Sequence, residues 1–257
     1  MARQEILGLA PIPGGTIAMR DARSATTRDV VLRPFSLGRT QLTRAEWSAV
    51  MDDAGTSPSL PRLPMHPLTW FDAIEWCNAA SGMAGFSPAY AVDGREVHWD
   101  VGADGYRLPT ESEWEWAARA GTTAPVYGPL ADIAWTAADA VTGPQLVAGK
   151  LANDFGLFDM IGNVWEWCWD YADTARYGDY RSLRGAGWDD PHWSARASVR
   201  RGSAPDALLE DVGFRVARGA VGVTGTLSAQ GWSADADKER ASIKGPRPVG
   251  WTPLRGF

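Results

Sequence analysis

The segment "GLFDMIGNVWEWCWD", residues 156–170, holds the side chains of this sequence whose types and spacing best suit chemistry. Asp159 and Glu166 supply carboxylates seven positions apart, and Gly162 lets the backbone between them turn sharply. Carboxylates and backbone carbonyls at short spacing suit Ca²⁺, which takes about six to eight oxygen ligands. The alternative is an ordinary turn followed by a strand whose Glu166 pairs with an arginine.

The second half of this segment alternates like a strand. Trp165, Trp167 and Trp169 would lie on one face, with Glu166 and Cys168 on the other. The sequence holds 14 tryptophans, an excess that indicates an aromatic core or an aromatic binding surface. We expect the three tryptophans of this strand to lie in the core.

A second segment, "WDDPHWSARASVRRGSAPDALLED" (188–211), concentrates charged and aromatic side chains without a periodic apolar face. Aromatic residues and arginine often anchor interfaces, so we expect a ligand-binding surface here. We call it the predicted ligand face, and its members are Trp188, Asp189, Asp190, His192, Trp193, Arg196, Ser198, Arg200, Asp206 and Asp211.

The same segment allows two other interpretations. His192, beside Asp189, is a candidate general acid or base, because imidazole changes charge near neutral pH. Alternatively, Arg196, Arg200 and Arg215 are structural and pair with aspartates of this segment. Of the three, Arg215 best fits a structural role.

Three short amphipathic helices are predicted to carry the framework, each beginning at a threonine N-cap. Thr43 is followed three positions later by Glu46, which is the pattern of a capping box. Thr69 and Thr110 occupy the same position in the other two helices, and Gly121 is expected to end the last one.

The remaining elements are expected to be short strands. Residues 14–19 and 29–38 are predicted to form one hairpin, and residues 89–100 another, with Asp93 and Gly94 at its turn. No long helix is expected between 122 and 218. The strand-like pieces there are residues 163–169, 181–187 and 212–218.

Composition narrows the classes of partner. The formal net charge is −6 and basic residues do not cluster, so neither nucleic acid nor a membrane surface is an expected partner. The first residues make a poor signal peptide, which favours a cytoplasmic protein. Cys77 and Cys168 lie in no Cys-x-x-Cys motif, so neither a disulfide nor a metal cluster is expected, and Cys77 reads as a core residue.

Three motifs in order resemble the formylglycine-generating-enzyme, or sulfatase-modifying-factor, family. They are "GYRLPTESEWEWAARAG", "GLFDMIGNVWEWCWD" and "LRGAGWDD…RASVRR…DVGFRVAR", and the resemblance runs from about residue 10 to 218. It implies an α+β fold of the C-type-lectin-like kind, with little regular secondary structure and bound calcium.

The resemblance also assigns ligands. It implies Ca²⁺ held by the side chains of Asp159 and Glu166 and the carbonyls of Gly162 and Val164. A second family calcium site is represented only by Asp132 and Ile133, with Asp139 as a substitute for the expected later acidic residue.

The sequence departs from the catalytic members of that family at one place. Those members bind Cu(I) through two cysteines and oxidise a substrate cysteine with O₂. The corresponding positions here fall near Asp190 and Ala195, and no cysteine occurs in 169–257. Because Cu(I) prefers thiolate ligands, we expect neither copper nor formylglycine generation.

Three functions therefore stay open. The first is a non-catalytic, calcium-stabilised module that binds a protein or small molecule, because 188–214 also resembles the variable region of diversity-generating-retroelement proteins. The second is an oxidative tailoring enzyme of the same family with other chemistry. A purely structural domain is a third. Residues 1–218 are the predicted domain, and 219–257 an extension that is either packed through Trp232 and Trp251 or flexible.

Overall fold

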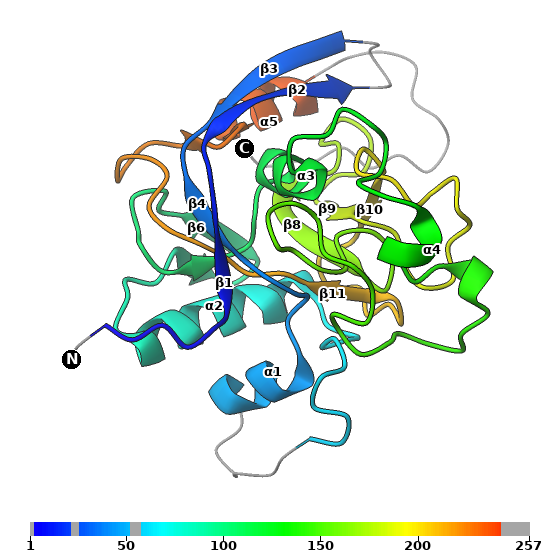
Figure 1. The fold of residues 1–257 in the computed structure, drawn as a ribbon. Coiled ribbons are helices and arrows are strands. Elements are labelled where there is room, and N and C mark those ends of the chain that lie inside the picture. The colour runs from blue at the N-terminus through cyan, green and yellow to red at the C-terminus, as the bar shows by residue number, and fades with distance from the viewer. Residues whose placement is uncertain (1–2, 22–25, 52–57, 243–257) are drawn as a thin grey trace.

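The computed structural model describes residues 3–21, 26–51 and 58–242, and combines short helices with short strands (Figure 1). The helices are α1 (Arg44–Met51), α2 (Trp70–Ala84), α3 (Glu111–Arg119), α4 (Leu130–Ile133) and α5 (Ala234–Ala241), with a 3-10 turn at Ala137–Asp139. Among the described residues, no helix combines the length and apolar character needed to cross a bilayer.

Most strands are also short. They are β1 (Leu9–Ile12), β2 (Gly15–Asp21), β3 (Thr26–Leu32), β4 (Phe35–Gly38), β5 (Tyr90–Asp93), β6 (Glu96–Trp99), β7 (Tyr106–Arg107), β8 (Trp165–Tyr171), β9 (Arg181–Arg184), β10 (Arg200–Ser203), β11 (Val212–Phe214), β12 (Ala217–Arg218), β13 (Ser228–Ala229) and β14 (Trp232–Ser233).

The three predicted helices begin where their caps indicate. Thr69 and Thr110 each accept a hydrogen bond from the third helical N–H, and the carboxylate of the acidic residue at that position accepts one from the backbone N–H of the cap. Thr43 and Glu46 form the same reciprocal pair ahead of α1. Each box satisfies amide groups that a helix start otherwise leaves unpaired.

Eight of the strands form two four-stranded sheets, in the orders β1-β4-β12-β7 and β10-β9-β8-β11. Strand β8 lies inside the second sheet, antiparallel to β9 and parallel to β11. Six of its seven residues are buried, so the Glu166 face is as enclosed as the tryptophan face. The strand thus carries Glu166 into the interior of the molecule.

The expected N-terminal hairpin is formed by β2 and β3, which pair over seven residues and arch over one end of the molecule (Figure 1). The second predicted segment, 29–38, divides at Pro34, and its later part becomes β4, which pairs with β1. Proline has no N–H to continue the ladder, which explains the break. The β5–β6 hairpin turns at Gly94 as predicted.

Tryptophans fill the core. Trp169 stacks on Tyr90 with ring centroids 5.2 Å apart and meets Trp99 at 5.6 Å. Trp232 completes this group at 5.4 Å from Trp169. Cys77 is fully buried, as predicted. The aromatic excess therefore belongs mainly to the core.

Trp232 belongs to the C-terminal extension, whose residues 219–242 return to the domain. Gln230 donates to the Glu113 carboxylate at 2.8 Å, and its carbonyl accepts from the Thr110 hydroxyl at 2.7 Å. These contacts attach the extension to the start of α3. Trp251, the other expected anchor, lies outside the described residues.

Candidate functional site

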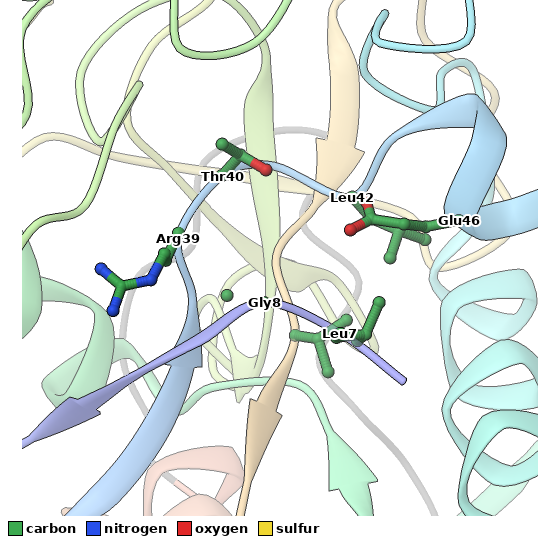
Figure 2. A pocket seen from close by; sticks show the side chains of 8 residues that line it. Leu7, Gly8, Arg39, Thr40, Leu42 and Glu46 are labelled. Carbon is green, nitrogen blue, oxygen red and sulfur yellow. The ribbon is translucent and has the colours of Figure 1, made fainter. Parts of the chain in front are cut away.

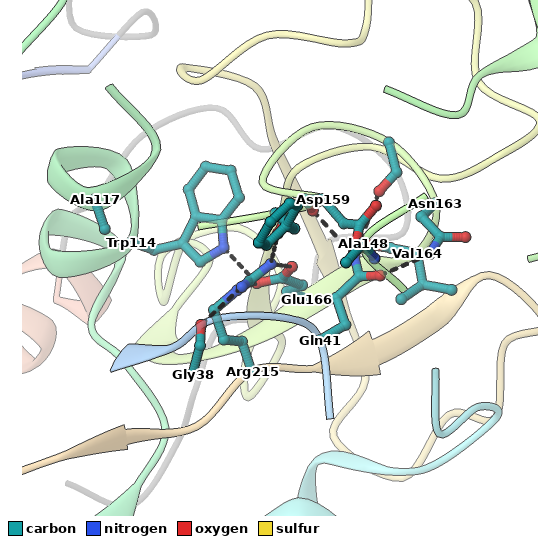
Figure 3. A network of polar contacts seen from close by, with 12 residues as sticks. Gly38, Gln41, Trp114, Ala117, Ala148, Asp159, Asn163, Val164, Glu166 and Arg215 are labelled. Carbon is teal, nitrogen blue, oxygen red and sulfur yellow. Dashed lines mark hydrogen bonds and ion pairs between the residues drawn. The ribbon is translucent and has the colours of Figure 1, made fainter. Parts of the chain in front are cut away.

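The turn ahead of β8 gathers three backbone carbonyls around one side chain. The carbonyl oxygens of Asp159, Gly162 and Val164 lie 3.3, 3.4 and 2.9 Å from Nε2 of Gln41 (Figure 3). Gly162 has φ 79, and a side chain there would collide with the Trp135 carbonyl, so glycine is required. The predicted carbonyl convergence is present, with an amide nitrogen at its centre.

Glu166 is an ion-pair partner inside the core. Its carboxylate accepts two hydrogen bonds from the Arg215 guanidinium, at 3.0 and 2.9 Å, and one from the Trp114 indole at 2.7 Å (Figure 3). Arg215 also donates to the carbonyls of Gly38 and Phe158. This is the alternative arrangement that the sequence allowed, a Glu166 paired with an arginine.

The carboxylate of Asp159 is only partly satisfied. One oxygen accepts from the Ala148 N–H at 2.7 Å, and the other is buried with no hydrogen-bond partner. Burial raises the pKa of Asp159 to about 6. The turn therefore contains several oxygen donors, which a calcium site requires.

As placed, however, these residues do not fit a calcium ion. The point where the carbonyls converge is taken by the N–H₂ group of Gln41, and both Glu166 oxygens are engaged by N–H donors. The described residues also contain no cluster of three histidine, cysteine, aspartate or glutamate side chains able to hold a metal. Calcium at Asp159, Gly162, Val164 and Glu166 stays a prediction.

The second predicted calcium site contains a cationic side chain. Lys150 Nζ lies 2.8 Å from the Asp139 carboxylate and 2.6 Å from the Ala131 carbonyl. It also sits 4.1 Å from the ring centroid of Trp135. Asp139 is thereby paired with a lysine.

Two members of the predicted ligand face are anchored to the domain. The Asp190 carboxylate accepts from the Trp165 indole at 2.7 Å and from the Gly187 N–H at 2.8 Å. Arg200 forms a two-bond ion pair with Glu111, the first residue of α3, in which Nε lies 2.6 Å from the carboxylate. Both side chains are engaged in holding the segment.

Three further members have partners of other kinds. Asp206 pairs with Arg95 at 2.9 Å, Asp211 pairs with Arg201 at 3.3 Å, and Arg196 donates to the carbonyl of a neighbouring residue in its own turn. Pairing of Arg196, Arg200 and Arg215 with aspartates of the segment is therefore the wrong detail of the structural alternative, since Arg215 pairs with Glu166. Glu111 and Arg95, which sequence reasoning missed, lie far away in the chain.

The remaining members project from this anchored segment. The Trp193 side chain is 66% exposed, and Asp189, His192 and Ser198 are exposed as well. Trp188 is half-buried, and its indole nitrogen has no hydrogen-bond partner among the described residues. Exposed polar and aromatic groups thus stand side by side along 188–198.

An ion network supports the segment from the domain side. Buried Arg184 of β9 pairs with Glu115 and Glu111 and donates to the Ala197 carbonyl at 3.1 Å. Arg119 completes the network by pairing with Glu115 at 2.7 Å. The backbone that carries Trp193 is therefore fixed by buried charges of α3 and β9.

The two thiols are separate and shielded. Cys77 lies in α2 and Cys168 in β8, both are fully buried, and neither forms a disulfide. Burial raises the pKa of both thiols, so both stay protonated near neutral pH. This is unlike the thiolate pair that Cu(I) requires.

Two hollows in the described part of the chain lie away from the predicted ligand face. Figure 2 shows the first, near Gly8 and Arg39, with a volume of ≈ 10 Å³, which is room for about one water molecule. The second, ≈ 290 Å³, is an open groove between Val31 of β3 and the extension near Val223. No member of the predicted ligand face lines either one.

Solved structures of other proteins share this architecture. A solved structure described as Treponema denticola variable protein 1 superposes with a TM-score of 0.72 at 26% identity, covering 82% of this chain and 94% of that one. PvdO from Pseudomonas aeruginosa superposes with a TM-score of 0.67 at 24% identity, over 82% and 94% of the two chains. The predicted α+β fold of the formylglycine-generating-enzyme type is confirmed.

Sequence relatives agree. "Inactive C-alpha-formylglycine-generating enzyme 2" of Mus musculus is 31% identical over 81% of this chain and 85% of its own length. "Chaperone protein LppX" of Paenibacillus barcinonensis is 29% identical over 82% and 89%. The family model described as "Sulfatase-modifying factor enzyme 1-like domain" matches residues 2–220, and the chain belongs to that family.

Proposed function

We propose that this chain is a non-catalytic binding module that recognises a protein through the exposed part of the predicted ligand face. The observation that carries the proposal is the contrast within 188–200. Asp190 and Arg200 are tied to the domain, while Trp193 between them is 66% exposed. A large aromatic side chain on a fixed backbone loses little conformational freedom when it is covered by a partner.

The thiols support a non-catalytic role. Cys77 and Cys168 are the only cysteines of the sequence, and both are buried in separate elements. The name of the mouse relative also describes an inactive protein. The alternative, an oxidative enzyme that uses His192 as an acid or base, has less support, because His192 is exposed and lines neither hollow.

A protein is a better candidate ligand than a small molecule. The exposed residues line neither of the two hollows described above, whereas small-molecule sites are usually concave and largely apolar. Among the relatives, one is named a chaperone and one a variable protein.

The test is selection of binding peptides. A displayed library of random peptides would be panned against the wild-type chain, and each enriched peptide measured against Trp193→Ala and Val31→Ala. Val31 is the matched control, since it is 76% exposed but lies on β3. We expect Trp193→Ala to weaken binding at least about tenfold, as an interface anchor would, and Val31→Ala to leave it unchanged.

Two outcomes would contradict the proposal. One is enrichment of peptides whose affinity is indifferent to Trp193→Ala. The other is failure of the wild-type chain to enrich any peptide above an unrelated protein. A melting temperature within a degree or so of wild type would show that Trp193→Ala remains folded, as its exposure predicts.

A further inference from the structure

We propose that the side-chain amide of Gln41 takes the place of a metal ion at the turn before β8, so that the chain needs no calcium. The proposal concerns Gln41, Asp159, Gly162 and Val164, and it is independent of the binding function proposed above. It would separate this chain from the calcium-binding pattern that its motifs imply.

The first step is that the turn leaves three backbone carbonyls in need of a donor or a cation. Three buried carbonyl oxygens point to one place, and each carries partial negative charge that must be met by a donor or a cation. Gln41 is fully buried and supplies two N–H groups to the carbonyls of Asp159, Gly162 and Val164. The contact with Val164, at 2.9 Å, is the shortest. Gln41 therefore supplies from within the chain the donors that these carbonyls need.

The second step fixes which end of the amide faces the carbonyls. Asn163 Oδ1 accepts from the Gln145 N–H at 2.8 Å, and Asn163 Nδ2 donates to the Gln145 carbonyl at 3.1 Å. These two backbone bonds determine the orientation of Asn163. Its Nδ2 also donates to Gln41 at 3.0 Å, which must therefore present its oxygen there (Figure 3). The nitrogen of Gln41 is left facing the three carbonyls.

The third step removes one of the two carboxylates of the predicted calcium site, that of Glu166. Glu166 neutralises Arg215, and both side chains are buried, with relative exposures of 1% and 0%. Turning Glu166 toward a metal would leave the guanidinium charge buried and uncompensated, which is costly. Lys150 plays a comparable part at the other predicted site, where its ammonium binds Asp139 and the Ala131 carbonyl.

The test compares melting temperatures in calcium and in chelator. For the wild-type chain we expect the same value in both, and no stoichiometric calcium by elemental analysis after purification. Gln41→Glu replaces the N–H₂ group by an oxygen that faces three carbonyls. We expect this variant to melt several degrees lower in chelator and to regain stability in calcium, because four oxygens then converge on one point.

Gln145→Glu is the matched control. It makes the same amide-to-carboxylate change on a half-buried neighbour whose side chain donates to the Gly143 carbonyl. We expect it to gain no response to calcium. Gln41→Leu, which removes the donor without adding charge, should melt lower than wild type to the same extent in calcium and in chelator.

A wild-type melting temperature that falls in chelator and recovers in calcium would overturn the proposal, as would bound stoichiometric calcium. If Gln41→Glu fails to fold, the wild-type measurement and Gln41→Leu still decide it. If Gln41→Glu folds and does not respond to calcium, the amide does not stand at a cation position, and the proposal fails.

Discussion

Glu166 and Arg215 illustrate at the scale of single residues why a buried charge is costly to leave alone. The pair is fully buried, and the Trp114 indole also donates to the carboxylate. Glu166→Gln would keep the shape and remove the charge that neutralises Arg215. We expect a loss of about 3–5 kcal/mol in the free energy of unfolding, measured by urea denaturation, with or without calcium.

The control for this variant is Asp154→Asn. Asp154 is exposed in the loop before the same turn, so the change should stay within about 0.5 kcal/mol of wild type. A Glu166→Gln loss below about 1 kcal/mol, or one that appears only in calcium, would contradict the ion-pair interpretation.

Some of these contacts could be predicted from the sequence and others could not. Thr69 and Thr110 were predicted as caps because a capping box is written within four consecutive positions. Gln41 donates to Val164 across 123 positions, and Arg184 pairs with Glu115 across 69. Such partners depend on how strands are ordered in space, which no local pattern specifies. A pairing of Glu166 with an arginine was foreseen only as the alternative to calcium, and the place of Gln41 was not foreseen.

Among the elements, strand β8 and helix α5 each carry a buried carboxyl group, and the two groups influence each other electrostatically. Asp170, in β8, accepts from the Glu111 N–H at 2.8 Å, and Asp237 of α5 accepts from the Trp232 indole at 2.9 Å. Burial and the neighbouring Asp237 raise the pKa of Asp170 to about 7, and burial raises that of Asp237. The interaction between Asp170 and Asp237 is therefore sensitive to pH.

The direction in which stability changes with pH follows from proton binding. Between about pH 4, where an unfolded aspartate ionises, and about pH 7, the folded chain keeps a proton that the unfolded chain has lost. Stability should therefore fall as the pH rises through this range and level off above it. Asp170→Asn should flatten the fall in thermal unfolding curves, while Asp235→Asn, exposed on the same helix as Asp237, should not. An unchanged slope for Asp170→Asn would contradict this account.

The element types followed from local signals, but their pairing did not. The 89–100 hairpin was predicted because its turn lies between the two strands that it joins. Burial of both faces of β8 was not, since alternation alone suggested two different faces. Its second face is covered in part by α3 and by Arg215, neighbours that come from either side of β8 in the chain.

For the whole molecule, the chemistry of the family's catalytic members should be absent. A peptide containing Cys-x-Pro-x-Arg would be incubated with the chain, copper, O₂ and a reductant, and analysed by mass spectrometry. We expect no conversion of the cysteine to an aldehyde, because Cys77 and Cys168 are buried apart and cannot supply a thiolate pair. Conversion above that of a heat-denatured sample would contradict the non-catalytic proposal.

The segment beyond residue 220 affects which part of this protein can be fused to another. The family match ends there, yet Gln230 and Trp232 reach back to Glu113 and to the ring of Trp169. A gene fusion that kept residues 2–220 and replaced the later residues would expose indoles to water and leave a buried carboxylate short of a donor. The smallest portion of this gene that can be moved intact to a new context is therefore longer than the family boundary suggests.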